Sequence, residues 1–399
     1  MALHEYLGYI QLGENVLWTP DDVYWGQLVG ASAALSGGIT TILDHSHISL
    51  SSEHVESALR GTLDSGVRSV FAPAKWNQSA WNDWQVAQFR SLGKRLPGGR
   101  NGRVTLGFAY DSINTEPKAV VNATMATVRA AGANLTTFHY VGSYNYGSIA
   151  GANANYPLDS TFVVSHCTYA LQEEFDLLQA VGAGMVSTPG TDGPMALGNS
   201  ESFVRVEAGM NRIGLGIDTQ SVAPGSMFEN MRLGLQSART LRNAELYSGA
   251  SGVPQRSLPK QLVETIAQAA RLATLGGAEA MHMESSIGSI AEGKQADLML
   301  VALDSPDILG ISPTDDESLL AGFVMFANPS DVKTVIVGGE IVKHQGELQR
   351  VHWYGDGGLV ASFSRQRDTL IQRLRASTVN WTANYEAVLA SFGLSDRLV

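Results

Sequence analysis

The stretch Ile213-Gly214-Leu215-Gly216-Ile217-Asp218 is a short apolar run that ends in an acid. We interpret it as a buried parallel strand, whose glycines let another part of the chain approach closely. Two earlier strand-like runs end on histidine, Leu135-Thr136-Thr137-Phe138-His139 and Phe162-Val163-Val164-Ser165-His166. Two imidazoles and one carboxylate, each at the C-terminal end of a strand, predict a divalent metal held at the mouth of a β/α barrel.

Strand-like runs alternate with longer amphipathic stretches through the first 250 residues or so. The predicted strands are 38–48, 68–74, 104–110, 134–140, 161–167, 183–189 and 212–218. The predicted helices include 19–36, 52–65, 81–96, 116–131, 170–181 and 226–243. Strand followed by helix, repeated, indicates an α/β fold of the TIM-type (β/α) barrel class. A closed barrel has eight strands, so we predict an incomplete barrel that lacks its first strand.

The pattern changes after the last of these strands. Residues 259–283 are predicted to be helical, and 296–301 and 333–337 to be strands. Gly338-Gly339 is a strong hairpin signal before a further strand at 340–343. We therefore predict three parts: a barrel domain at 1–285, a small β-module at 286–352 and a helical segment at 353–399.

Composition limits the classes of function. The chain has 399 residues and a formal net charge of -11, which disfavours nucleic acid as a partner. Its one cysteine, Cys167, excludes an internal disulfide, and we expect it to be a small buried hydrophobe. We find no membrane span, secretory signal or lipidation motif, so we expect a cytoplasmic protein that acts on a small molecule, with a homo-oligomer possible.

Several motifs resemble one known family. The stretches 163–167, 185–189 and 214–218 resemble the last three barrel strands of the amidohydrolase superfamily, in its cytosine/guanine deaminase and triazine hydrolase branch. Residues 273–301 are similar to the segment where that family leaves the barrel for its β-sandwich, and 332–348 resembles the closing hairpin. The resemblance implies that the module at 286–352 is a partial β-sandwich.

The chain also departs from that family. Members usually begin with sandwich strands and a first barrel strand that ends in a metal-binding His-x-His pair, whereas Met1 here leads directly into the segment that follows the pair. We expect that the missing strand and the missing motif belong to one and the same segment. In the deaminase branch a catalytic Glu often follows the strand-five histidine by three residues, and Gly142 stands at that place.

The resemblance implies roles for three residues. His139, His166 and Asp218 would ligate one divalent metal, most plausibly zinc, and Asp218 would also accept a proton from the attacking water. From the residues alone each has a structural alternative. The histidines could be buried and bonded to backbone carbonyls, and Asp218 could cap a helix or form a loop salt bridge.

The pair His45-Ser46-His47 follows the β-like run 40–44, so both rings point the same way. Without the resemblance these histidines are natural further metal ligands. Within it, this strand is the second one, whose end lines the substrate pocket, and a purely structural role is a third possibility. We predict that His45 and His47 bind substrate, as does Asp192 in the loop at 188–195, although Asp192 could equally form a turn.

These residues predict metal-dependent hydrolysis of a C–N bond, other than a peptide bond, in a small cyclic amide, amidine or amino-heterocycle. Zinc with three protein ligands keeps a position for water. The alternative is a degenerate, metal-free homologue that acts as a binding or partner subunit, or an inactive truncated product. The sequence does not distinguish these by itself.

Overall fold

The computed structural model describes residues 1–75, 83–96, 102–144, 147–250, 252–349, 351–353 and 358–398. Part of the helix expected at 81–96 lies outside these residues. Within them, no helix combines the length and the apolar character needed to cross a membrane.

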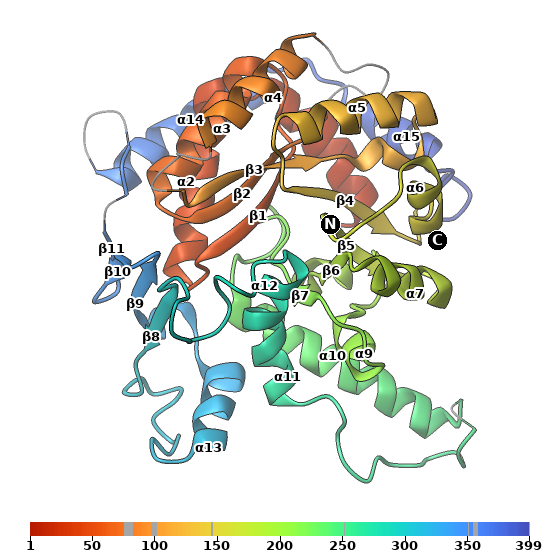
Figure 1. Cartoon of the computed structure of the whole chain (residues 1–399), viewed down its shortest axis with the longest axis vertical. Coiled ribbons are helices and arrows are strands. Elements are labelled where there is room, and N and C mark those ends of the chain that lie inside the picture. Colours follow the sequence, from red (N-terminus) through yellow and green to blue (C-terminus); the bar gives the residue numbers. More distant parts are fainter. Residues whose placement is uncertain are drawn as a thin grey trace.

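Seven parallel strands form one curled sheet in sequence order, and β1 and β7 are its unpaired edges within the described residues (Figure 1). The strands are β1 (Thr41–Ser46), β2 (Arg68–Pro73), β3 (Val104–Ala109), β4 (Leu135–Val141), β5 (Phe162–Thr168), β6 (Gly184–Ser187) and β7 (Ile213–Leu215). The prediction of an incomplete TIM-type barrel is confirmed. All seven predicted runs contain a strand.

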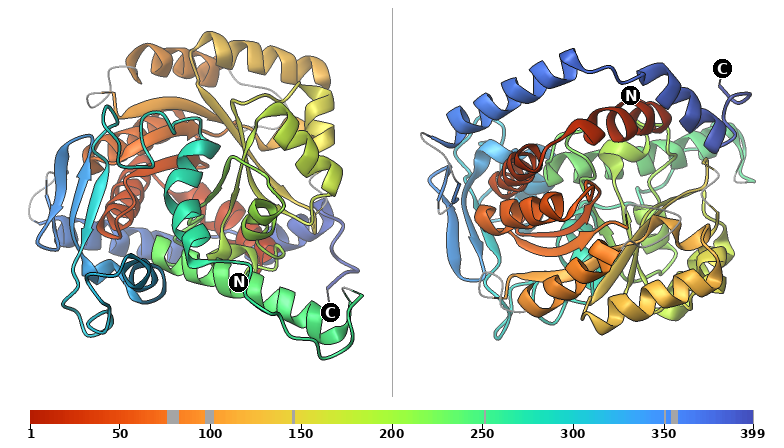
Figure 2. Two further views of the ribbon diagram at one scale, coloured as in Figure 1. Left: turned by 60° about the horizontal axis from the view of Figure 1, so that its bottom comes forward. Right: turned by 90° about the horizontal axis from the view of Figure 1, so that it is seen from above.

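Helices connect the strands and cover the outer face of the sheet (Figures 1 and 2). They are α2 (Pro20–Ser36), α3 (Ser52–Ser65), α4 (Asp83–Arg95), α5 (Lys118–Ala130), α6 (Ile149–Asn155), α7 (Gln172–Val181), α8 (Pro189–Asp192), α9 (Ser202–Glu207) and α10 (Met227–Ser248). Buried side chains from these helices and from the outer face of the strands form the main hydrophobic core.

The opposite end of the barrel is closed by the segment that follows α10. The helix α12 (Gly277–Ala280) lies so near the sheet that a Cβ at Gly184 would stand 2.1 Å from the carbonyl oxygen of Ala280. A Cβ at Gly214 would stand 2.8 Å from the Cα of Gly277. Glycine at these strand positions therefore permits the close approach that the sequence indicated.

A second, antiparallel sheet has the strand order β11-β10-β9-β8. Its strands are β8 (Leu298–Val301), β9 (Val332–Val337), β10 (Glu340–His344) and β11 (Glu347–Leu348), and Gly338-Gly339 forms the predicted hairpin turn. Asp297 joins this sheet to the barrel. It accepts hydrogen bonds from Arg68 Nε and Nη2, each at 2.9 Å, and from the backbone N–H of Gly338 at 2.7 Å.

The chain ends in two helices, α14 (Leu359–Ala376) and α15 (Trp381–Ser391), as predicted. They lie beside the N-terminal segment, where the π-helix η1 (Tyr6–Glu14) contacts α15 and α14 packs on α2 (Figure 2). The helix expected from residue 259 begins only at Ile266, in α11 (Ile266–Arg271). Thr265 caps it by accepting a hydrogen bond from Gln268, which fixes the start of the helix there.

We expect Asp297→Ala to lower the free energy of unfolding by about 3–5 kcal/mol, because it leaves Arg68 buried and unpaired. The two side chains are 3% and 8% exposed. Urea denaturation measures the effect. The control is Asp368→Ala, which removes an ion pair whose side chains are 61% and 52% exposed and should cost less than about 1 kcal/mol. Equal losses in the two variants would contradict this view of Asp297.

Candidate functional site

The site lies at the C-terminal ends of the barrel strands, where parallel pairing brings the last residues of neighbouring strands together. His45 and His47 stand at and just beyond the end of β1, and Asp111 follows β3 at the start of a 3-10 turn, η4 (Asp111–Asn114). His139 lies in β4 and His166 in β5. Asp218 follows β7.

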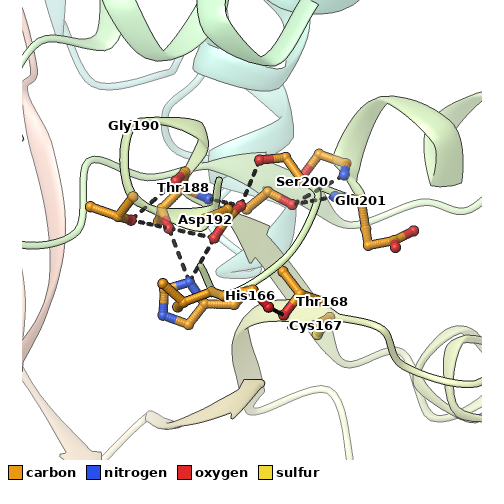
Figure 3. Close-up of polar contacts among 12 residues, drawn as sticks. His166, Cys167, Thr168, Thr188, Gly190, Asp192, Ser200 and Glu201 are labelled. Carbon is orange, nitrogen blue, oxygen red and sulfur yellow. Dashed lines mark hydrogen bonds and ion pairs between the residues drawn. The ribbon is translucent and has the colours of Figure 1, made fainter. Parts of the chain in front are cut away.

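His166 is held by a network of buried hydrogen bonds (Figure 3). Its Nδ1–H donates to Oδ1 of Asp192 at 2.9 Å. The Asp192 carboxylate, which is fully buried, also accepts from the Thr188 hydroxyl at 2.9 Å, from the Thr188 backbone N–H at 3.0 Å and from the Ser200 hydroxyl at 2.6 Å. Because a carboxylate can only accept, Nδ1 of His166 must carry hydrogen, and in the neutral ring Nε2 keeps its lone pair.

His139 is held in a similar way by Asp111. Its Nδ1–H and its backbone N–H both donate to Oδ1 of Asp111 at 2.9 Å. The rings of His139 and His166 are stacked with their centroids 5.4 Å apart. Each of these two imidazoles is therefore oriented through Nδ1 by a carboxylate, and each keeps Nε2 for another partner.

The two histidines after β1 face the other oxygen of Asp111. Nε2 of His45 lies 3.2 Å and Nε2 of His47 lies 3.7 Å from Oδ2 of Asp111. The ring centroid of His45 is 4.4 Å from that of His47 and 4.2 Å from that of His139. The rings of His45 and His47 therefore point the same way, as the sequence predicted.

His45 is unusual because both of its ring nitrogens are buried without a hydrogen bond among the described residues. Burial lowers the pKa of His45 to about 3, and the negative charge of Asp111 offsets this effect only in part. The ring is therefore neutral at physiological pH, which is the form that can bind a metal.

The carboxylates of the site stay ionised. Burial alone would raise the pKa of Asp218, but the nearby imidazoles of His166 and His139 and a hydrogen bond from Thr191 outweigh it and lower that pKa. Burial likewise opposes ionisation of Asp111, yet His45 and His139 hold its pKa well below the usual value.

The imidazole of His166 is affected by the same carboxylates. Burial disfavours its charged form, but Asp192 and Asp218 outweigh this effect and raise the pKa of His166.

Backbone strain also occurs at the same strand ends. His166, Cys167 and Asp218 have φ angles of 71°, 54° and 54°, in the left-handed region that non-glycine residues rarely adopt. The register between β4 and β5 shifts beside Cys167, so that Tyr140 pairs with His166 and Val141 with Thr168. Such residues cost about 1–3 kcal/mol each and cluster at functional sites. Cys167 itself is fully buried, as predicted.

The site residues fit a divalent cation. Four side chains, His45, His47, Asp111 and His139, offer ligand atoms that all lie within 4.8 Å of one another, and this group includes neither His166 nor Asp218. Neutral imidazoles and ionised carboxylates are the donors that zinc prefers. The orphaned nitrogens of His45 give a buried polar group for which a cation would be a partner.

Sequence reasoning named every histidine of this site but missed Asp111. The signal was present, since Asp111 directly follows the predicted strand 104–110 just as Asp218 ends another run. It also placed Asp192 at the substrate, whereas the structure engages both oxygens of that carboxylate with His166, Thr188 and Ser200.

Comparison with known proteins places the chain in a family. The model of the amidohydrolase family matches residues 3–342. A 5-methylthioadenosine/S-adenosylhomocysteine deaminase of Moorella thermoacetica is 26% identical over 341 residues, which are 82% of this chain and 73% of the relative. The enzyme of the same name from Acetivibrio thermocellus is 23% identical over 366 residues, which are 88% and 77% of the two chains.

Solved structures share the fold. An adenosine deaminase from Xanthomonas campestris with bound zinc has a TM-score of 0.75 at 20% identity, over 94% of this chain and 81% of that one. An atrazine chlorohydrolase from Arthrobacter aurescens complexed with zinc has a TM-score of 0.64 at 17% identity, over 92% and 80% of the two chains.

Acid should destabilise the metal-free protein through His45. Its folded pKa is about 3 against 6.5 in the unfolded chain, so the unfolded state binds more protons between these values and stability is lost as pH falls. We expect His45→Gln to reduce the slope of unfolding free energy between about pH 6 and pH 4, by up to about 1.4 kcal/mol per pH unit. Urea unfolding at a series of pH values measures this slope.

Above about pH 7.5 the imidazole is neutral in both states, so parent and variant should there show the same pH dependence. Equal slopes in the acid range would contradict the assignment of a neutral, buried His45.

Proposed function

This chain belongs to the amidohydrolase family and is a hydrolase of the deaminase type, and on that premise we propose that it deaminates a small amino-heterocycle. In this reaction water attacks the ring carbon that carries the amino group. A C–O bond forms and the C–N bond breaks. One proton of the water leaves with the amino group as ammonia, the other passes to the adjacent ring nitrogen, and the ring gains a carbonyl group.

The proposal rests on one observation: two imidazoles make the same kind of hydrogen bond to a carboxylate. His139 and His166 each donate Nδ1–H to a carboxylate at 2.9 Å, and each retains Nε2. A histidine that binds a metal typically donates its other N–H to a carboxylate or carbonyl, which fixes the tautomer and the ring orientation. We propose that His139, His166 and Asp218 hold one divalent ion, with zinc as the best candidate for these donors.

When bound, the ion supplies a Lewis acid that activates water at neutral pH. The protein's own residues supply the rest. Asp218, which its surroundings keep ionised, accepts the proton of the attacking water. It then delivers that proton to the nitrogen that leaves, so the carboxylate returns to its starting state.

For Asp192 we propose a role other than the substrate contact predicted from the sequence. Because its carboxylate is fully buried and bonded to His166, Thr188 and Ser200, we propose that it positions His166 rather than contacting substrate. His45 and His47 remain predicted to line the pocket beside the metal-binding set, and the side chain of His47 is 31% exposed there.

The substrate class follows from the relatives' names, which point to 6-aminopurine nucleosides. The test is ammonia release by the zinc-loaded protein from 5-methylthioadenosine, S-adenosylhomocysteine and adenosine. We expect turnover of at least one of these, lost on treatment with a chelator and restored by zinc. A folded, zinc-loaded protein that releases ammonia from none of them would contradict the proposal and favour a non-catalytic binding subunit.

Asp218→Asn should lower kcat by about 100- to 10,000-fold, because the amide cannot accept the proton of the attacking water. Steady-state ammonia release measures the loss. Asp304→Asn is the matched control, since Asp304 is exposed on the small sheet side of the molecule and should leave kcat unchanged. A kcat for Asp218→Asn within about threefold of the parent would exclude this residue as the base.

Asp192→Asn should lower activity or zinc affinity by about 10- to 100-fold, because the amide can present N–H toward His166 Nδ1 and favour the wrong tautomer. A competition titration with a zinc chelator measures the affinity. Ser200→Ala, which removes one neutral donor to the same carboxylate, should have a much smaller effect. If both variants bound zinc like the parent, Asp192 would not position a ligand.

A further inference from the structure

We propose that His45, His47 and Asp111 form a second divalent-cation position, beside the set of His139, His166 and Asp218 and bordered by His139. This position goes beyond the proposed deaminase activity, which needs only the other set.

The distances suit a small cation. Nε2 of His45 and Nε2 of His47 lie 3.2 and 3.7 Å from the same oxygen, Oδ2 of Asp111. In a tetrahedral zinc site with bonds of about 2.0–2.1 Å, neighbouring ligand atoms stand roughly 3.3 Å apart. The two distances to Oδ2 are therefore close to the spacing of ligands on one ion, and one ligand atom from each residue lies within 4.8 Å of the others.

The unsatisfied imidazole argues against a purely structural role. Both nitrogens of His45 are buried, and neither has a well-formed hydrogen bond within the described part of the chain; Nε2 has its 3.2 Å contact with Oδ2 of Asp111. A buried donor or acceptor without a partner costs about 1–3 kcal/mol. A cation bound to Nε2 would satisfy one of these nitrogens and the lone pair of His47 at the same time.

The two oxygens of Asp111 have separate tasks. Oδ1 accepts both hydrogen bonds from His139, whereas Oδ2 lies next to the two histidines after β1. Asp111 can thus orient His139 for the first set with one oxygen and ligate a second ion with the other. Each oxygen of Asp111 therefore serves only one of the two cation positions.

The charge of the site allows two cations. The carboxylates of Asp111, Asp192 and Asp218 belong to the site, and those of Asp111 and Asp192 contact its four imidazoles directly. Two divalent ions would therefore meet a mostly compensating set of negative charges.

The ligands also come from firmly placed elements. His45 is the fifth residue of β1 and pairs in register with Ala72 of β2, and Asp111 starts the turn η4 directly after β3. Beneath that turn, the buried carboxylate of Glu116 accepts hydrogen bonds from Lys75, Tyr110 and Ser112. The turn that presents Asp111 is thus anchored independently of any ion.

The test is zinc titration of the full chain, with a competing chelator to give affinity and elemental analysis to give stoichiometry. We expect two zinc ions per parent chain. The double variant His166→Ala/Asp218→Asn should still bind one, and adding His47→Gln or Asp111→Asn to it should weaken that ion at least 100-fold. His344→Gln, on an exposed part of β10, is the control and should bind like the parent.

A parent chain that saturates at one zinc ion, unaffected by His47→Gln, would overturn the proposal. So would a folded double variant that binds no zinc. Circular dichroism verifies folding, and His47→Gln in the parent background should reduce two ions to one even if the triple variants fail to fold. Two bound ions without ammonia release would contradict only the proposed function. Zinc-dependent turnover with one ion would contradict only the second position.

Discussion

Parallel pairing of the seven barrel strands is the constraint on which the rest of this structure depends. Because all strands run in one direction, every strand brings its last residues to the same rim. Six polar side chains that are far apart in the sequence meet there without a long loop to carry them. The opposite rim is filled by α12 and the residues after it, against Gly184 and Gly214, which leaves the first rim for chemistry.

This constraint explains how much could be predicted. The hydrophobic runs that end in His139, His166 and Asp218 predict strands, and the polar residue at the end of each run marks its C-terminal end. The fold class and these candidate site residues could therefore be predicted from the sequence. Asp111 was missed because a strand-end Asp also commonly begins a turn, which it does here in η4. Only the register of β3 beside β4 shows that its carboxylate reaches His139.

Two further features depend on local geometry that no periodicity reveals. The regular pairing of β5 with β4 ends at Cys167, where the register shifts and the backbone adopts positive φ angles. That bend presents His166 to Asp192, which comes from the turn after β6. The sequence placed Asp192 in a pocket loop, but its role depends on which buried donors surround it, and Thr188 and Ser200 are such donors.

The small sheet, which has no residue in the site, still bears on the site's geometry. β1 pairs only with β2 among the described strands, so its other edge lacks a ladder to hold it. Asp297 compensates at the start of both strands, since it accepts hydrogen bonds from Thr41 of β1 at 3.3 Å and from Arg68 of β2 at 2.9 Å. A shift of β1 along β2 would move His45 and His47 by the same amount away from Asp111. The buried ion pair between Arg68 and Asp297 therefore helps to fix the register of β1 on β2 from the far end of the barrel. That register brings His45 and His47 close to Asp111.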